Sequence, residues 1–124
     1  MTNWPTNYSL FGWLVNMKRG GHVAPHIHES GWLIGAVYIN VPSNLKDDTG
    51  NFVACLDDEK DATGAQKYPH EIIDVATGNL VFFPASLLHY SIPFESGEAR
   101  IVFPIDVFPR AKGSEKKYSA YPSL

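Results

Sequence analysis

Two histidines separated by one residue, His26 and His28, have the spacing that most directly suggests chemistry. On a β-strand the side chains at i and i+2 lie on the same face, so these two imidazoles could bind one metal ion. A third histidine, His89, ends a run at 80–89 that has the pattern of a strand. A close pair with a distant third ligand is typical of a facial metal site that leaves positions open for substrate and oxygen.

Each of these histidines also has a purely structural interpretation. The pair could lie on a solvated strand face, and His89, which follows two leucines, could be a buried histidine that is hydrogen bonded within a core. The metal interpretation is favoured by context. A proline and a glycine flank the pair, a very apolar run follows directly, and the third histidine has a matching setting.

Arg100 opens an apolar stretch eleven positions after His89, across one expected turn, so the two strands are expected to pair. An arginine at the start of a strand is usually a surface residue. An arginine that points into the fold beside a metal would instead offer a planar pair of donors to a carboxylate.

The other polar candidates have weaker patterns. His22 is expected in an exposed turn, with an outer-sphere role as the alternative, and His70 is expected to face solvent. Cys55 is expected to be a small core residue. The acidic run at 57–61 lacks the spacing of a calcium loop and is interpreted as solvated, as is the basic tail after residue 110.

Short strands must position these residues, because ten glycines and nine prolines divide the chain and no long helical period is present. The expected strands are eight in number: 8–17, 22–28, 32–41, 51–56, 71–75, 80–83, 87–93 and 100–108. In the first of them Phe11, Trp13, Val15 and Met17 form an apolar set that is expected to face the core. This spacing predicts an all-β fold of two facing sheets, a jelly roll. Residues 57–69 are expected to form a flexible loop or lid, and 110–124 a surface tail.

The whole-chain properties limit the classes of function. At 124 residues the chain is expected to be one domain over 1–124. A net charge of -3 and a pI of about 5.9 argue against a nucleic-acid partner. A single cysteine, no signal-peptide pattern and no long apolar run favour a cytoplasmic protein without a membrane partner. The oligomeric state stays open, a homodimer included.

Two segments together resemble a known family. Residues 20–38 contain His-x-His, Gly31-Trp32 and Tyr38, and are similar to the metal-binding half of the 2-oxoglutarate- and Fe(II)-dependent oxygenases. Residues 78–89, with 92–94, Arg100 and 106–109, resemble the distal-histidine half of the same family. The resemblance covers roughly residues 9 to 109, with 57–69 outside it.

The resemblance implies a double-stranded β-helix of the cupin-like type, with Fe(II) as cofactor and 2-oxoglutarate as cosubstrate. His26 and His89 would be the two histidine ligands, and Arg100 would bind the far carboxylate of 2-oxoglutarate. Tyr38 occupies the place at which prolyl-hydroxylase-like enzymes put a tyrosine on that carboxylate; a core tyrosine is the alternative. The implied reaction converts 2-oxoglutarate to succinate and oxidises, typically hydroxylates, a small-molecule or peptide substrate that the sequence does not identify.

The sequence departs from the wider superfamily at His28, where Asp or Glu is usual. Histidine can also bind iron, so His26, His28 and His89 form the expected ligand set. Losing one negative charge is expected to weaken Fe(II) binding and change its redox potential. Glu29 would point to the opposite strand face and is a poor substitute. Val102 stands where a serine or threonine is often found.

Two alternative functions remain. One is a cupin-like dioxygenase that uses the three histidines without 2-oxoglutarate, in which Arg100 would have no role. The other is a non-catalytic β-roll binding module, which the short chain and His28 favour. Substitution of Arg100 distinguishes the first alternative, and metal content distinguishes the second.

Overall fold

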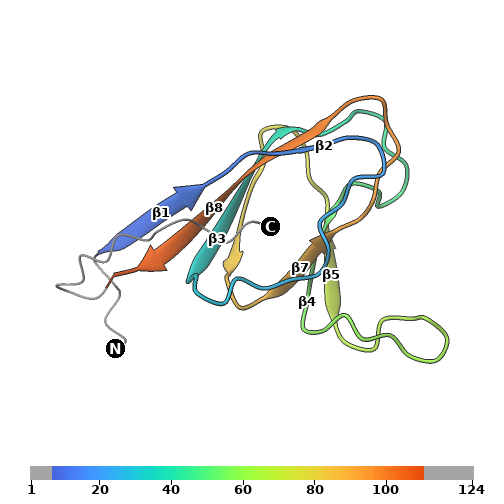
Figure 1. Cartoon of the computed structure of the whole chain (residues 1–124). Helices are drawn as coiled ribbons and strands as arrows, with labels where there is room; N and C mark the ends of the chain where they lie inside the picture. Colours follow the sequence, from blue (N-terminus) through green and yellow to red (C-terminus); the bar gives the residue numbers. More distant parts are fainter. Residues whose placement is uncertain (1–6, 111–124) are drawn as a thin grey trace.

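The computed structural model describes residues 7–110, which form eight β-strands and no helix (Figure 1). The strands are β1 (Tyr8–Gly12), β2 (Val15–Met17), β3 (Leu33–Asn40), β4 (Phe52–Cys55), β5 (His70–Ile73), β6 (Leu80–Pro84), β7 (Leu88–Ser91) and β8 (Arg100–Pro109). The predicted all-β fold is confirmed. Most of the predicted tail lies outside the described residues. Within the described part of the chain, no helix is long and apolar enough to cross a membrane.

Two predicted strands do not form as predicted. The run 8–17 is divided into β1 and β2, which both pair with β8 in one continuous register. Trp13 lies opposite Pro104 and donates its N–H to the Pro104 carbonyl at 3.2 Å, but proline has no N–H to return, so the ladder is interrupted there.

The predicted strand 22–28 is absent except at His26, which forms an isolated antiparallel bridge with His89. Pro25 gives the physical reason, since it fixes its own φ and contributes no ladder hydrogen bond. The segment therefore runs beside β7 as an irregular chain, which bonds to β7 through His26 at His89 and through Val23 at Ser91.

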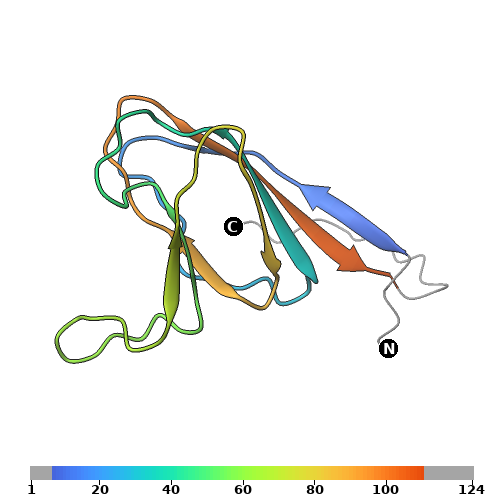
Figure 2. The ribbon, with the colours of Figure 1, turned by 180° about the vertical axis from the view of Figure 1, so that it is seen from behind.

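All strand pairs are antiparallel and make two sheets. The larger sheet has the order β1-β8-β3-β6, with β2 also paired to β8, and the smaller sheet has the order β5-β4-β7. Phe52 of the smaller sheet packs with Ile34 and Phe83 of the larger one, so the two sheets face each other across a shared core. Figures 1 and 2 show this arrangement from opposite sides.

The inner face of the larger sheet is defined by residue parity. The even-numbered residues of β3 up to Tyr38 and most of those in β8 point to this face, and Ile34, Tyr38 and Val102 are buried there. Met17 is also buried, and Trp13 and Val15 are half-buried, as the alternating pattern predicted. Phe11 is exposed, so the prediction is wrong for that residue.

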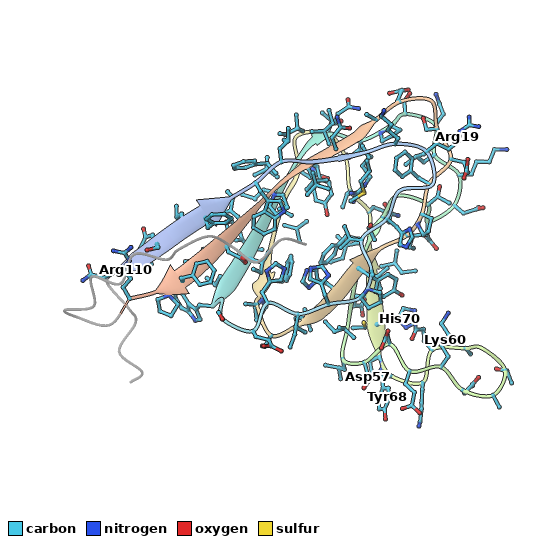
Figure 3. The ribbon with its side chains drawn as sticks, in the orientation of Figure 1. Arg19, Asp57, Lys60, Tyr68, His70 and Arg110 are labelled. Carbon is cyan, nitrogen blue, oxygen red and sulfur yellow. The ribbon has the colours of Figure 1, made fainter. Side chains whose placement is uncertain are left out.

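The loop at 57–69 follows β4 and projects away from both sheets (Figures 1 and 2). It has no strand of its own apart from an isolated bridge between Lys60 and Gln66. Its labelled residues Asp57, Lys60 and Tyr68 lie beyond the end of the smaller sheet (Figure 3). The loop is therefore confirmed as irregular, and in this conformation it does not cover the space between the sheets.

Candidate metal centre

His26, His28 and His89 come together between the two sheets. Each offers a ring nitrogen, and these nitrogens all lie within 4.8 Å of one another. The Nε2 atoms of His26 and His28 are 3.1 Å apart. The sequence prediction that the three histidines converge is therefore met by the geometry.

Backbone hydrogen bonds rather than a regular strand hold the histidine pair in place. His26 and His89 exchange two N–H···O bonds of 3.1 Å, and the His28 N–H donates to the Ala85 carbonyl at 2.9 Å. After the pair, the Gly31 N–H donates to the His28 carbonyl at 3.2 Å, and this hydrogen-bonded turn ends the segment. The i, i+2 spacing thus places both imidazoles on one side even though the segment is not a strand.

The outward-facing nitrogen of each imidazole has an acceptor beside it. The Nδ1 atoms of His26 and His89 lie 2.8 and 2.9 Å from the carbonyls of Ala24 and Leu87, and His28 Nδ1 lies 3.0 Å from Asp106 Oδ2. Carbonyl and carboxylate oxygens accept hydrogen bonds and do not donate them. The ring nitrogen that faces each of them must therefore be the donor, which assigns the ring proton to Nδ1 in all three histidines.

That assignment leaves three Nε2 lone pairs directed at one another. Neutral lone pairs at such distances repel unless a cation lies between them. Neutral imidazoles whose second nitrogen is hydrogen bonded are common ligands of divalent transition metals. The donor set therefore fits a metal ion such as Fe(II), with three positions supplied by the protein.

Burial keeps His89 in the form that a metal requires. The pKa of His89 is lowered from 6.5 to about 4, chiefly because burial in the pocket desolvates the charged ring; the hydrogen bond to the Leu87 carbonyl opposes this shift, and the charges of His26 and His28 add to it by smaller amounts. Phe83 and Phe52 lie against the imidazole, with ring centroids 4.6 and 5.7 Å away. His89 consequently remains neutral, and able to bind a metal, well below neutral pH.

This shift predicts how the stability of the metal-free protein depends on pH. Unfolded His89 takes up its proton near pH 6.5 and folded His89 near pH 4, so between these values the unfolded state binds more protons. The contribution of His89 to the free energy of unfolding should be fully present above pH 6.5 and should fall by up to about 3 kcal/mol as the pH drops toward 4. Denaturant titrations in chelator would measure it. The variant His89→Gln should show a flatter profile, and equal profiles would contradict the assignment.

Asp106 is a site residue that the sequence analysis did not single out. Its side chain is 0% exposed, and it accepts the hydrogen bond from His28 at 3.0 Å. The His28 ring also stacks on Trp13, with ring centroids 6.1 Å apart. The available signal was a lone acidic residue within the apolar strand β8, which indicates a buried carboxylate with a specific partner.

Arg100 is buried on the same inner face of β8, with 3% of its surface exposed. Its Nε donates to the Gly50 carbonyl at 2.9 Å, Nη1 lies 3.8 Å from Met17 Sδ, and the guanidinium lies 5.2 Å from the Tyr38 ring centroid. Among residues 7–110, no carboxylate forms an ion pair with it. Desolvation raises the pKa of Tyr38, against a smaller lowering by Arg100, so the tyrosine stays neutral and the guanidinium charge is uncompensated.

One pocket contains both groups of residues. It has a volume of about 130 Å³ and is lined by the three histidines, Arg100 and Tyr38, and otherwise mainly by apolar side chains. The prediction that Arg100 points into the roll is met, and Tyr38 both packs in the core and lines the pocket. Val102 lines it as well, whereas Trp32 does not.

The remaining candidates lie elsewhere. His22 and His70 are exposed and Cys55 is buried, as predicted from their sequence contexts, and Glu29 is exposed as well. None of these four residues lines the pocket. The acidic loop residues are also exposed.

Fold and site together define a family. Residues 12–106 match the family described as "Putative 2OG-Fe(II) oxygenase", and the chain belongs to this family of 2-oxoglutarate- and Fe(II)-dependent oxygenases. The predicted family and the double-stranded β-helix are thereby confirmed. No curated protein matches the sequence.

Solved structures show the same fold at low sequence identity. An oxidoreductase of the 2OG-Fe(II) oxygenase family from Burkholderia pseudomallei has a TM-score of 0.63 at 11% identity, over 82% of this chain and 45% of its own. A Pseudomonas putida prolyl-4-hydroxylase has a TM-score of 0.59 at 17% identity, over 86% and 55%. The α-ketoglutarate-dependent epimerase SnoN of nogalamycin biosynthesis has a TM-score of 0.59 at 15% identity, over 94% and 59%. The chain thus spans about half the length of these proteins.

Proposed function

We propose that this protein is a 2-oxoglutarate- and Fe(II)-dependent oxygenase of the hydroxylase type, in which His26, His28 and His89 bind the iron. One observation carries the proposal. Three imidazoles with convergent ring nitrogens line the same pocket as a buried guanidinium that has no carboxylate partner among residues 7–110. A pocket with a metal-binding end and an anion-binding end matches a cosubstrate that has an oxo-acid at one end and a carboxylate at the other.

Arg100 and Tyr38 form the anion-binding end in this proposal. A buried guanidinium without a carboxylate partner is costly, and a bidentate carboxylate satisfies it best. The neutral Tyr38 hydroxyl can donate a further hydrogen bond to the same carboxylate. Arg100 Nε is already engaged by the Gly50 carbonyl at 2.9 Å, which fixes the direction of the guanidinium.

Each part of the chain then has a role in the reaction. The histidines orient the metal, Arg100 and Tyr38 orient the cosubstrate, and the apolar walls that include Ile34, Phe83 and Val102 exclude water. When bound, Fe(II) would supply oxygen activation coupled to the decarboxylation of 2-oxoglutarate to succinate. The oxidised substrate, a small molecule or a peptide, is not defined by these residues.

The pocket also bears on the two alternatives. A three-histidine dioxygenase without 2-oxoglutarate would use the same metal end but would leave the Arg100 charge buried without a function. A binding module without catalysis has no need for three convergent Nε2 atoms. The paired metal and anion ends therefore favour the 2-oxoglutarate-dependent reaction.

An anaerobic Fe(II) titration with and without 2-oxoglutarate, followed by visible absorption, tests this proposal. A weak charge-transfer band that needs both additions is expected, because it reports chelation of the iron by the oxo-acid. Iron binding without the band would indicate the three-histidine dioxygenase. No iron binding would exclude both enzymes and leave the binding module.

A further inference from the structure

We propose that Asp106 is a positioning residue that supplies, from behind His28, the negative charge that the three-histidine site itself lacks. The inference rests on the proposed function, because it concerns the metal that the histidines would hold. It begins from the contact between His28 Nδ1 and Asp106 Oδ2 at 3.0 Å, in which the two side chains are 8% and 0% exposed.

The site needs such a charge. Three neutral imidazoles leave a divalent cation with its full charge in a pocket that also holds the Arg100 guanidinium. Among the described residues that line the pocket or hydrogen bond to the three histidine rings, Asp106 is the single carboxylate. A carboxylate that accepts the Nδ1 proton of a ligand makes Nε2 more basic and fixes the ring, so part of its charge reaches the metal.

Asp106 is held rigidly for this purpose. It lies in β8 between β1 and β3, where it is paired with Phe11 on one side and Ile34 on the other. The turn at Gly31 packs beside the carboxylate, since a Cβ at that position would be in ordinary contact with Asp106 Oδ1 at 3.5 Å. A buried charge in a fixed backbone position is well suited to orient His28.

The test is a double-mutant cycle on Fe(II) affinity, measured anaerobically. Asp106→Asn keeps the shape but removes the charge, and it should weaken Fe(II) binding by about 10- to 100-fold. In the His28→Asp background, where the metal would receive a carboxylate directly, the same change should have no effect or should tighten binding. Asp74→Asn is the matched control, because Asp74 is an exposed carboxylate that accepts a hydrogen bond from Asn51 away from the pocket.

The outcomes separate this inference from the proposed function. Equal Fe(II) affinity in the wild type and Asp106→Asn would overturn the role of Asp106 and leave the oxygenase intact, whereas a wild type that binds no iron would overturn both. Should Asp106→Asn not fold, NMR of the Zn(II)-loaded wild type gives a second reading. A deshielded, slowly exchanging Nδ1 proton on His28, distinct from those of His26 and His89, is expected, and its absence would overturn the proposal.

Discussion

Replacing Arg100 with methionine is expected to abolish 2-oxoglutarate-dependent turnover while Fe(II) binding persists. The guanidinium is 3% exposed, and it lies in the pocket with the histidines but is not one of them. Leaving a carboxylate in this pocket without its charged partner should cost about 2–5 kcal/mol, which is roughly 30-fold to several thousand-fold in the affinity for 2-oxoglutarate. Succinate formation and the Fe(II)-dependent charge-transfer band would measure the loss.

The methionine variant is suited to this test because it should fold. Removing a buried cation that has no carboxylate partner relieves a desolvation cost, and methionine fills much of the same volume. Arg19→Met is the control, since Arg19 is exposed, pairs with Glu95 at 3.4 Å and lies at the edge of the molecule (Figure 3). Normal 2-oxoglutarate turnover in Arg100→Met would show that the cosubstrate is held elsewhere.

The alternation of apolar residues predicted most of the fold. The apolar runs at 32–41, 80–83 and 100–108 became β3, β6 and β8 within two residues at each end. The alternating pattern did not predict the effects of two prolines on strand pairing. Pro104 interrupts the partner ladder across the sheet, and Pro25 prevents the histidine segment from becoming a strand. The effect of Pro104 falls on the neighbouring strand, so it can be predicted only when the register between the two strands is known.

The convergence of the histidines was predictable because it depends on residue type and on the order of strands. The partner of His28 was not, because Asp106 is 78 positions away and its pairing depends on β8 lying between β1 and β3. Parity in β8 does connect the two unusual residues, since Arg100 and Asp106 are both even-numbered and share one face. A charged pair at even spacing in an apolar strand therefore indicates a functional inner face.

Removing any one of the three histidines is expected to weaken Fe(II) binding by at least about 100-fold, because even changes to outer partners of metal ligands cost 10- to 100-fold. His26→Ala, His28→Ala and His89→Ala should each lose the rise in melting temperature that Fe(II) gives the wild type, since that rise follows the affinity of the folded state for the ion. Thermal unfolding with and without Fe(II), under anaerobic conditions, would measure it.

The chain provides its own controls for this experiment. His22 and His70 are exposed and lie outside the pocket, so His22→Ala and His70→Ala should respond to Fe(II) as the wild type does. The key comparison is at His28. If His28→Ala keeps full affinity, two histidines and solvent suffice to bind the ion, and the Asp106–His28 contact has a structural role alone. If His28→Ala loses affinity and His28→Asp restores it, position 28 is a ligand position. In the natural protein His28 would then bind the ion, and Asp106 would supply the negative charge through its contact with His28.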